Sequence, residues 1–78
     1  MGIMIQEKIV EMRSAAGLTQ RELAKILDRE HSFVARVEQG ERRVDLAELF
    51  LICKACGTSP EKEISGLIKK FSFKQDKS

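Results

Sequence analysis

Residues 28–43, with the sequence DREHSFVARVEQGERR, combine hydrogen-bonding and cationic side chains at the spacing of one helical face. On a helical wheel at 100° per residue, Val34 and Val37 fall opposite these polar groups. The polar side consists of Ser32, Ala35, Arg36 and Gln39, with His31 at its edge. It offers hydrogen-bonding groups and one fixed cation, and it carries no carboxylate. Such a face suits base edges in the DNA major groove, where Arg can bind guanine in a bidentate way and a small alanine permits close approach.

The same face could also be the ordinary solvated side of a surface helix, and the helix alone does not decide between these interpretations. Neighbouring residues favour the DNA-binding interpretation. Gln20 stands at the start of an expected helix, where it can donate to a phosphate beside exposed backbone N–H groups. Arg42 and Arg43 follow the polar helix, where a loop can contact the DNA backbone. Three separate cationic or donor sites around one polar helix would rarely arise by chance.

The remaining residue types that could do chemistry do not form a reactive set. Cys53 and Cys56 make the only C-x-x-C motif, and His31 is the only histidine, whereas a zinc site needs about four ligands. A redox C-x-x-C is expected where a helix opens after a strand, but this motif ends a helical pattern. We interpret both cysteines as small core thiols in a reducing cytosol. Without a catalytic constellation or a Gly-rich phosphate loop, the sequence predicts no enzyme, no metal and no cofactor.

Length and composition are those of one small globular domain, with 78 residues, 42% hydrophobic and 33% charged. Fourteen basic and 12 acidic residues give a net charge of +2, so any basic patch must come from placement. No apolar run approaches the ~18 residues of a membrane span, and the N-terminus has no signal-peptide pattern. We therefore expect a cytoplasmic protein that contacts no membrane. One domain should cover residues 1–73, with a frayed polar tail at 74–78.

The elements that would position these residues are helices, because the apolar period is helical throughout and no β-type alternation occurs. Capping boxes are expected at Thr19–Glu22 and Asp45–Glu48, and C-terminal stops at Gly17, Gly40 and Gly57. The expected helices cover about residues 4–15, 19–27, 31–39, 45–56 and 59–71. Short connections between them predict a compact all-α domain, and the roughly three residues between the second and third helices suit a helix-turn-helix.

The segments AGLTQRELAKIL and SFVARVEQGERR resemble the Cro/C1-type helix-turn-helix family, the phage-repressor-like (XRE) DNA-binding domains, over about residues 8–68. The matching motif is Gly17-Leu18-Thr19-Gln20, Glu22-Leu23-Ala24, Leu27, Val34 and Val37-Glu38-x-Gly40. The resemblance implies a five-helix, lambda-repressor-like domain that reads the major groove with its third helix. The function it implies is sequence-specific transcriptional regulation, most simply repression.

The resemblance also implies roles for individual residues. Base contacts fall on His31, Ser32 and Arg36. DNA-backbone contacts fall on Thr19, Gln20, Arg42 and Arg43. A structural ion pair is implied between Arg13 of the first helix and Glu38 of the third. The wheel position of Glu38, next to Val34, agrees with partial burial of its carboxylate.

Three residues depart from the family's pattern in the turn before the third helix. Asp28 stands where glycine is common, and we expect a positive φ there, which Asp tolerates better than most residues. Arg29 replaces an apolar residue, so we expect its stem to cover the core edge while its charge stays in water. Glu30 favours the N-terminus of a helix but repels a nearby phosphate, unless it accepts from a cytosine amine.

The fifth helix carries an apolar stripe at i, i+3, i+4 and i+7, formed by Ile64, Leu67, Ile68 and Phe71. A domain of this size has too little interior to cover the whole stripe, and the first four helices are needed for the core and the DNA face. Ile68 and Phe71 are therefore predicted to pack across the two-fold axis of a homodimer.

The expected partner is double-stranded DNA with an inverted-repeat operator. A phage or plasmid repressor, a restriction–modification controller and an antitoxin with a toxin as its protein partner all fit the sequence. The alternative function is a protein-interaction module that uses the same fold with little DNA readout. Glu30 and the small net charge favour this alternative, whereas Gln20, Arg42 and Arg43 disfavour it.

Overall fold

The computed structural model describes residues 2–72, with the side chains of residues 5–70. Its five α-helices are α1 (Gly2–Ala15), α2 (Gln20–Ile26), α3 (Phe33–Glu38), α4 (Leu46–Ala55) and α5 (Pro60–Ser72). These residues include no strand, and the predicted five-helix all-α fold is confirmed. None of the described helices is both long and apolar enough to cross a bilayer. The tail expected at residues 74–78 lies outside the described residues.

Both predicted capping boxes are present. The Thr19 hydroxyl accepts from the Glu22 backbone N–H at 3.0 Å, and the Glu22 carboxylate accepts from the Thr19 N–H at 2.8 Å. Asp45 and Glu48 exchange the same two bonds at 2.7 and 3.0 Å. Each box satisfies backbone N–H groups that the first turn of a helix leaves without partners. The two boxes therefore fix the beginnings of α2 and α4.

The turn between α2 and α3 explains why α3 is shorter than the expected 31–39. Asp28 has a φ of 59°, as expected at this position. The N–H groups of Asp28 and Arg29 donate to the carbonyls of Lys25 and Ala24 at 3.0 and 2.9 Å, a Schellman ending of α2. The chain then turns once more before α3 begins at Phe33, so the expectation that the helix starts at 31 is wrong.

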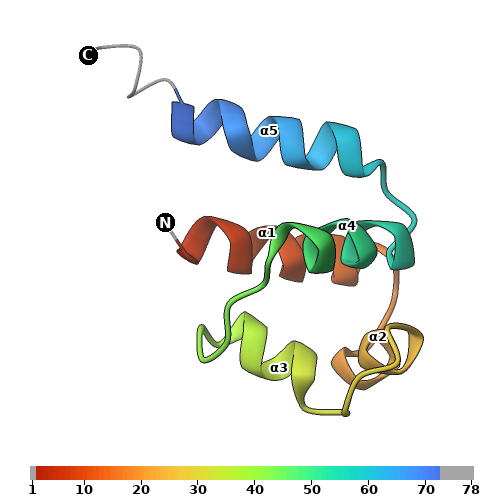
Figure 1. The fold of residues 1–78 in the computed structure, drawn as a ribbon. Helices are drawn as coiled ribbons and strands as arrows, with labels where there is room; N and C mark the ends of the chain where they lie inside the picture. Colours follow the sequence, from red (N-terminus) through yellow and green to blue (C-terminus); the bar gives the residue numbers. More distant parts are fainter. Residues whose placement is uncertain (1, 73–78) are drawn as a thin grey trace.

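The core joins all five helices. Its buried members are Ile9, Met12, Leu23, Ala24, Phe33, Val34, Val37, Leu49, Ile52, Cys53, Cys56 and Leu67. Figure 1 shows α5 across one side of α1 and α4, with α2 and α3 together on the other side. Lys8 of α1 and Glu63 of α5 form an ion pair at 3.0 Å. The helix-turn-helix is therefore left on a surface that α5 does not cover.

The two cysteines belong to this core. Both are free and buried, and Cys53 Sγ lies 3.8 Å from Met12 Sδ. Burial raises the pKa of both thiols, because the thiolate would lose its hydration. Their interpretation as core thiols is confirmed.

Candidate nucleic-acid interface

The helix-turn-helix is held together by the inner face of α3. Phe33, Val34 and Val37 are buried, and Ala24 of α2 is fully buried where its small side chain permits close packing of the two helices. α3 packs against both α1 and α2. The inner face of α3 thus belongs to the core, as the helical wheel predicts, and its outer face points away from it.

The outer face of α3 presents the proposed base-reading side chains. Arg36, Gln39 and His31 are exposed, and Ser32 is half-buried. Ser32 occupies the N-cap of α3, but its side chain makes no capping hydrogen bond. Within the described part of the chain, no hydrogen bond or ion pair engages these four side chains. Their donors and acceptors are therefore available to a ligand.

A basic surface that sequence reasoning missed lies beside this face, on α2. Arg21 and Lys25 are exposed and stand one helical turn apart. Together with His31 they border a shallow open hollow, whose lining residues are Arg21, Glu22, Lys25, Asp28, Arg29 and His31. The i, i+4 spacing of two cations directly after Gln20 was the signal that could have identified this surface.

Glu38 holds the C-terminal end of α3 in what we call the Glu38 cluster (Arg13, Gln20 and Glu38). Arg13 donates from Nε to Glu38 Oε2 at 2.7 Å and from Nη2 to Oε1 at 3.1 Å. The Arg13 and Glu38 side chains are only 16% and 6% exposed. Their hydrogen bond raises the pKa of Arg13. The structure thus brings the two residues together across the seam between α1 and α3.

Gln20 also belongs to this cluster, since its Nε2 donates to Glu38 Oε1 at 2.8 Å. The Gln20 amide has a second hydrogen that this bond does not use. The contact of Gln20 with a phosphate therefore stays a prediction. The second hydrogen is available for it while the first keeps its bond to Glu38. Thr19, the other predicted contact at this helix start, uses its hydroxyl oxygen for the capping box.

A second carboxylate lies at the other end of α3, in what we call the Glu48 cluster (Arg29, Phe33, Arg42 and Glu48). Arg42 donates from Nη1 to Glu48 Oε1 at 3.0 Å and from Nη2 to Oε2 at 2.9 Å. Arg29 also donates to Glu48 Oε2. The guanidinium carbons of the two arginines lie 4.5 and 4.8 Å from the centroid of the Phe33 ring.

The Glu48 cluster changes the expected environment of Arg29. Its charge was expected to stay in water, but Glu48 pairs with it, because α4 begins directly beside the turn before α3. The hydrogen bonds from Arg42, the Asp45 backbone N–H and Arg29 lower the pKa of Glu48 to about 2. The carboxylate is thus ionised wherever DNA binding would occur.

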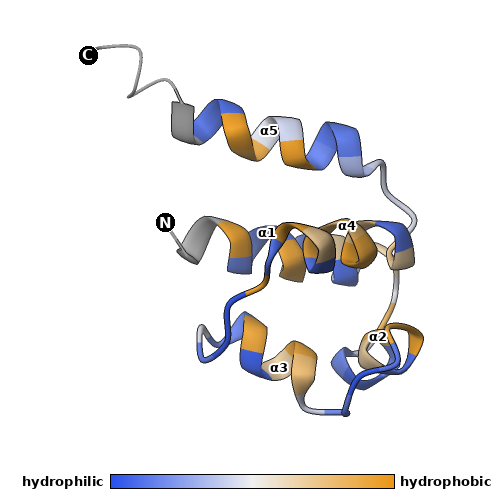
Figure 2. Ribbon diagram, in the orientation of Figure 1, coloured by the Kyte–Doolittle hydropathy of each residue, from blue (hydrophilic) through white to orange (hydrophobic). Residues whose placement is uncertain are grey.

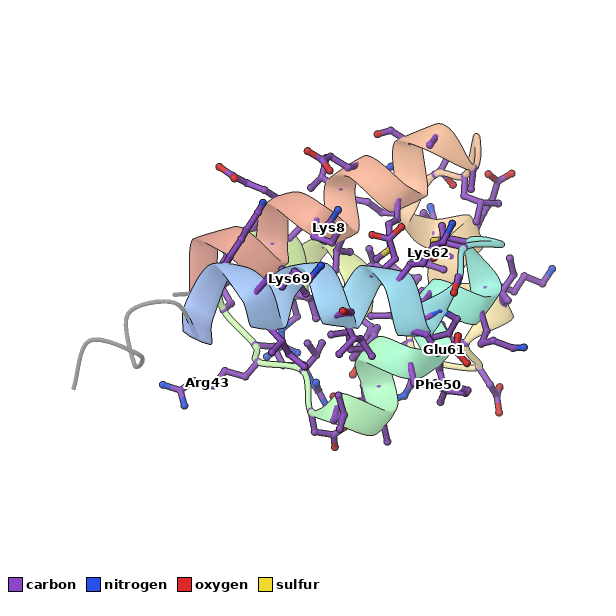
Figure 3. The ribbon with its side chains drawn as sticks, turned by 90° about the horizontal axis from the view of Figure 1, so that it is seen from above. Lys8, Arg43, Phe50, Glu61, Lys62 and Lys69 are labelled. Atoms are coloured by element: carbon purple, nitrogen blue, oxygen red, sulfur yellow. The ribbon has the colours of Figure 1, made fainter. Side chains whose placement is uncertain are left out.

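The two arginines after α3 have different surroundings. Arg43 is exposed, and Figure 3 shows its side chain pointing away from the helices. Arg42 is turned back to Glu48, and this hydrogen bond raises the pKa of Arg42. The DNA-backbone contact predicted for Arg42 is untested, and Arg42 would have to leave Glu48 to make it.

The surface expected to form a dimer is only partly described. Ile68 is 54% exposed while its neighbour Leu67 is buried, and the side chain of Phe71 lies outside the described residues. The premise that the first four helices have no spare apolar face is wrong. On α4, Leu46 and Phe50 are 67% and 44% exposed. Their i, i+4 spacing was visible in the sequence.

Comparisons with known proteins agree with this geometry. A family model described as a helix-turn-helix domain matches residues 9–64. An XRE-family like protein from Pseudomonas syringae pv. tomato str. DC3000 is similar in structure, with a TM-score of 0.82 and 40% identity over 90% of this chain and 85% of that chain. The restriction-modification controller protein C.AhdI from Aeromonas hydrophila is similar with a TM-score of 0.71 and 29% identity, over 80% of this chain and 90% of that chain. No curated protein sequence matches the chain significantly.

Proposed function

Because this chain belongs to the XRE-type helix-turn-helix family, we propose that it is a sequence-specific transcriptional repressor that places α3 in the DNA major groove. The observation that carries this proposal is the division of α3 into two faces. Val34 and Val37 are buried, whereas Arg36 is exposed and makes no ion pair with another described residue. A helix that only closed the core would not need a cation and hydrogen-bonding groups gathered opposite its apolar side.

Two sets of contacts follow from the proposal. Base edges are contacted by His31, Ser32 and Arg36. The DNA backbone is contacted by Thr19, Gln20 and Arg43, and also by Arg21 and Lys25 on α2. The contact predicted for Arg42 is left out of this set, because Glu48 binds its guanidinium group. Support comes from exposure, since Arg21, Lys25 and Arg43 are all exposed around the reading face. Phosphate contacts of this kind position a protein, while base contacts supply its sequence preference.

We propose that the protein acts as a homodimer in the cytoplasm. Exposed Ile68 on α5, with Leu46 and Phe50 on α4, supplies the apolar surface for a second copy, and Phe71 extends the predicted stripe. The buried, free state of Cys53 suits a reducing compartment. Among the possible classes of regulator, the likeness to C.AhdI supports a restriction–modification controller.

The experiment that tests this function is in vitro selection of bound double-stranded DNA from a random library, repeated at several salt concentrations. Two recognition helices in a symmetric dimer stand roughly 34 Å apart, so we expect an inverted repeat with about 10 base pairs between half-site centres. An enriched site without two-fold symmetry would argue against the dimer. No enrichment at any salt concentration would favour the alternative of a protein-interaction module, which the exposed carboxylate Glu30 beside α3 also favours.

The dimer surface can be tested with two matched isoleucines. Ile68 on α5 and Ile26 on α2 are both 54% exposed, but only Ile68 lies on the proposed interface. Ile68→Asp should place a charge in the contact and give a folded monomer at micromolar concentration, with weaker operator binding. Ile26→Asp should remain a dimer. If sedimentation finds Ile68→Asp as dimeric as Ile26→Asp, the interface lies elsewhere.

A further inference from the structure

Two cations flank the reading helix, one on each side in sequence. Arg29 lies in the turn before α3, and Arg42 lies in the loop that leads from α3 to α4. Figure 2 shows the connection before α3 as hydrophilic and the connection after it as largely hydrophilic, with one hydrophobic segment before α4. The two side chains are 38% and 36% exposed, so either could extend into solvent if it were released. Released, Arg42 would extend from the loop for which a DNA-backbone contact is predicted, and Arg29 from the turn directly before α3.

Glu48 holds both of these cations through one carboxylate. Its Oε1 accepts from the Asp45 backbone N–H and from Arg42 Nη1, each at 3.0 Å. Its Oε2 accepts from Arg42 Nη2 at 2.9 Å and from Arg29. A carboxylate has about four acceptor positions, and these four bonds occupy them. The Glu48 side chain is 12% exposed, so water has little access to compete for the arginines.

Two other parts of the cluster fix this arrangement. The capping box places Glu48 in the first turn of α4, because its bond to the Asp45 N–H holds the side chain against the helix start. The Phe33 ring is buried in the core, and both guanidinium groups lie over it at cation–π distance. The arginines are thus held by a charge and an aromatic ring that are both rigidly placed.

We propose that Glu48 keeps Arg29 and Arg42 from DNA phosphates and so limits the affinity of the protein for DNA of any sequence. The inference rests on the proposed DNA-binding function. Phosphate contacts strengthen binding to every sequence about equally, so holding two cations back lowers operator and non-operator affinity alike. With two cations neutralised in part beside α3, Arg36 and its neighbours account for a larger share of the total affinity.

The test compares Glu48→Gln with a matched control, Glu41→Gln. Glutamine keeps an oxygen for the Asp45 N–H, as in capping boxes that use Gln, but removes the charge that binds the arginines. Glu41 is an exposed carboxylate in the same connection after α3, and it makes no ion pair with a described residue. Both variants change the net charge equally, so the comparison accounts for the general effect of losing one carboxylate.

The measurement is fluorescence anisotropy with a duplex of random sequence and fixed length, over a series of KCl concentrations. Glu48→Gln should bind this duplex more tightly than the wild type. Its plot of log K against log[salt] should steepen by about 0.9 for each arginine that reaches a phosphate, hence by up to ~1.8. Glu41→Gln should keep the wild-type slope. In the double variant Glu48→Gln/Arg42→Ala, the salt slope should be less steep than in Glu48→Gln by about one unit.

If Glu48→Gln does not fold, the single variant Arg42→Ala provides a second test. Arg42→Ala alone should leave the wild-type salt slope unchanged, since Arg42 is already bound to Glu48. If it flattens the slope by about one unit, Arg42 contacts a phosphate in the wild type and the proposal is wrong. Equal slopes for folded Glu48→Gln and Glu41→Gln would also overturn it. If the wild-type protein binds no DNA even at low salt, the proposed function fails and this inference fails with it.

Discussion

The two ends of α3 are each held by a carboxylate that binds arginine, but the two carboxylates lie in different surroundings. In the Glu38 cluster, at the C-terminal end, the side chains of Arg13 and Glu38 are 16% and 6% exposed. In the Glu48 cluster, at the N-terminal end, Arg29 and Arg42 are 38% and 36% exposed. The Arg13–Glu38 pair joins α1 and α3, whereas the Glu48 cluster lies beside the proposed DNA face.

Because the two clusters differ in burial, the same pairing of arginine with carboxylate has a different role in each. A buried pair that loses one partner leaves an unpaired charge in a poorly solvated position, so such a loss acts mainly on stability. A half-exposed arginine that loses its carboxylate can move into water at little cost. We therefore expect changes in the Glu38 cluster to alter folding, and changes in the Glu48 cluster to alter the charge that the protein presents to DNA.

The largest expected effect is that of Arg13→Ala. It should destabilise the protein by up to about 3 kcal/mol, because the partly buried Glu38 would lose its charged partner and keep only the hydrogen bond from Gln20. DNA binding should fall in parallel with the fraction of folded protein, as measured by urea unfolding and anisotropy on the same samples. Arg21→Ala, which removes an exposed arginine of α2, should leave the unfolding midpoint nearly unchanged. A variant at Arg13 that unfolds like the wild type but no longer binds DNA would make Arg13 a DNA contact.

A smaller effect, with a characteristic pH dependence, is expected for Glu48→Gln. Folding lowers the pKa of Glu48 from 4.5 to about 2, so its ion pairs stabilise the folded state fully above about pH 4.5 and lose this effect as pH falls towards 2. The difference in melting temperature between wild type and variant should be constant above pH 5 and should shrink below it. Circular dichroism melts from pH 7 to 2 measure this difference directly. A difference that does not change with pH would mean that Glu48 is not the titrating group.

The contrast between the clusters also shows what the sequence could predict. Local patterns were sufficient for the capping boxes that begin α2 and α4. The positive φ of Asp28 and the pairing of Arg13 with Glu38 came from the family resemblance. All of these depend on spacing within one helix or turn, or on positions that the family pattern contains.

The Glu48 cluster, which sequence reasoning missed, depends on contacts between different segments of the chain. Nothing near Arg29 or Arg42 indicates that both would bind Glu48, because the carboxylate comes from the next helix and the shared ring of Phe33 comes from α3. The late start of α3 follows from hydrogen bonds in the turn before it, which the helical wheel does not contain. The exposed face of α4 was overlooked because the first four helices were assigned as a whole to the core and the DNA face.

The central claim is that the outer face of α3 reads DNA sequence, and Arg36 tests it most directly. In vitro selection with Arg36→Ala should relax the preference at one base position in each half-site, where the variant loses about 1–3 kcal/mol of discrimination. The control Arg43→Ala should bind all sequences more weakly and select the same operator as the wild type, with a salt slope flatter by about one unit. If Arg36→Ala selects an unchanged operator and merely weakens binding to every sequence alike, α3 does not read bases through Arg36 and the account is contradicted.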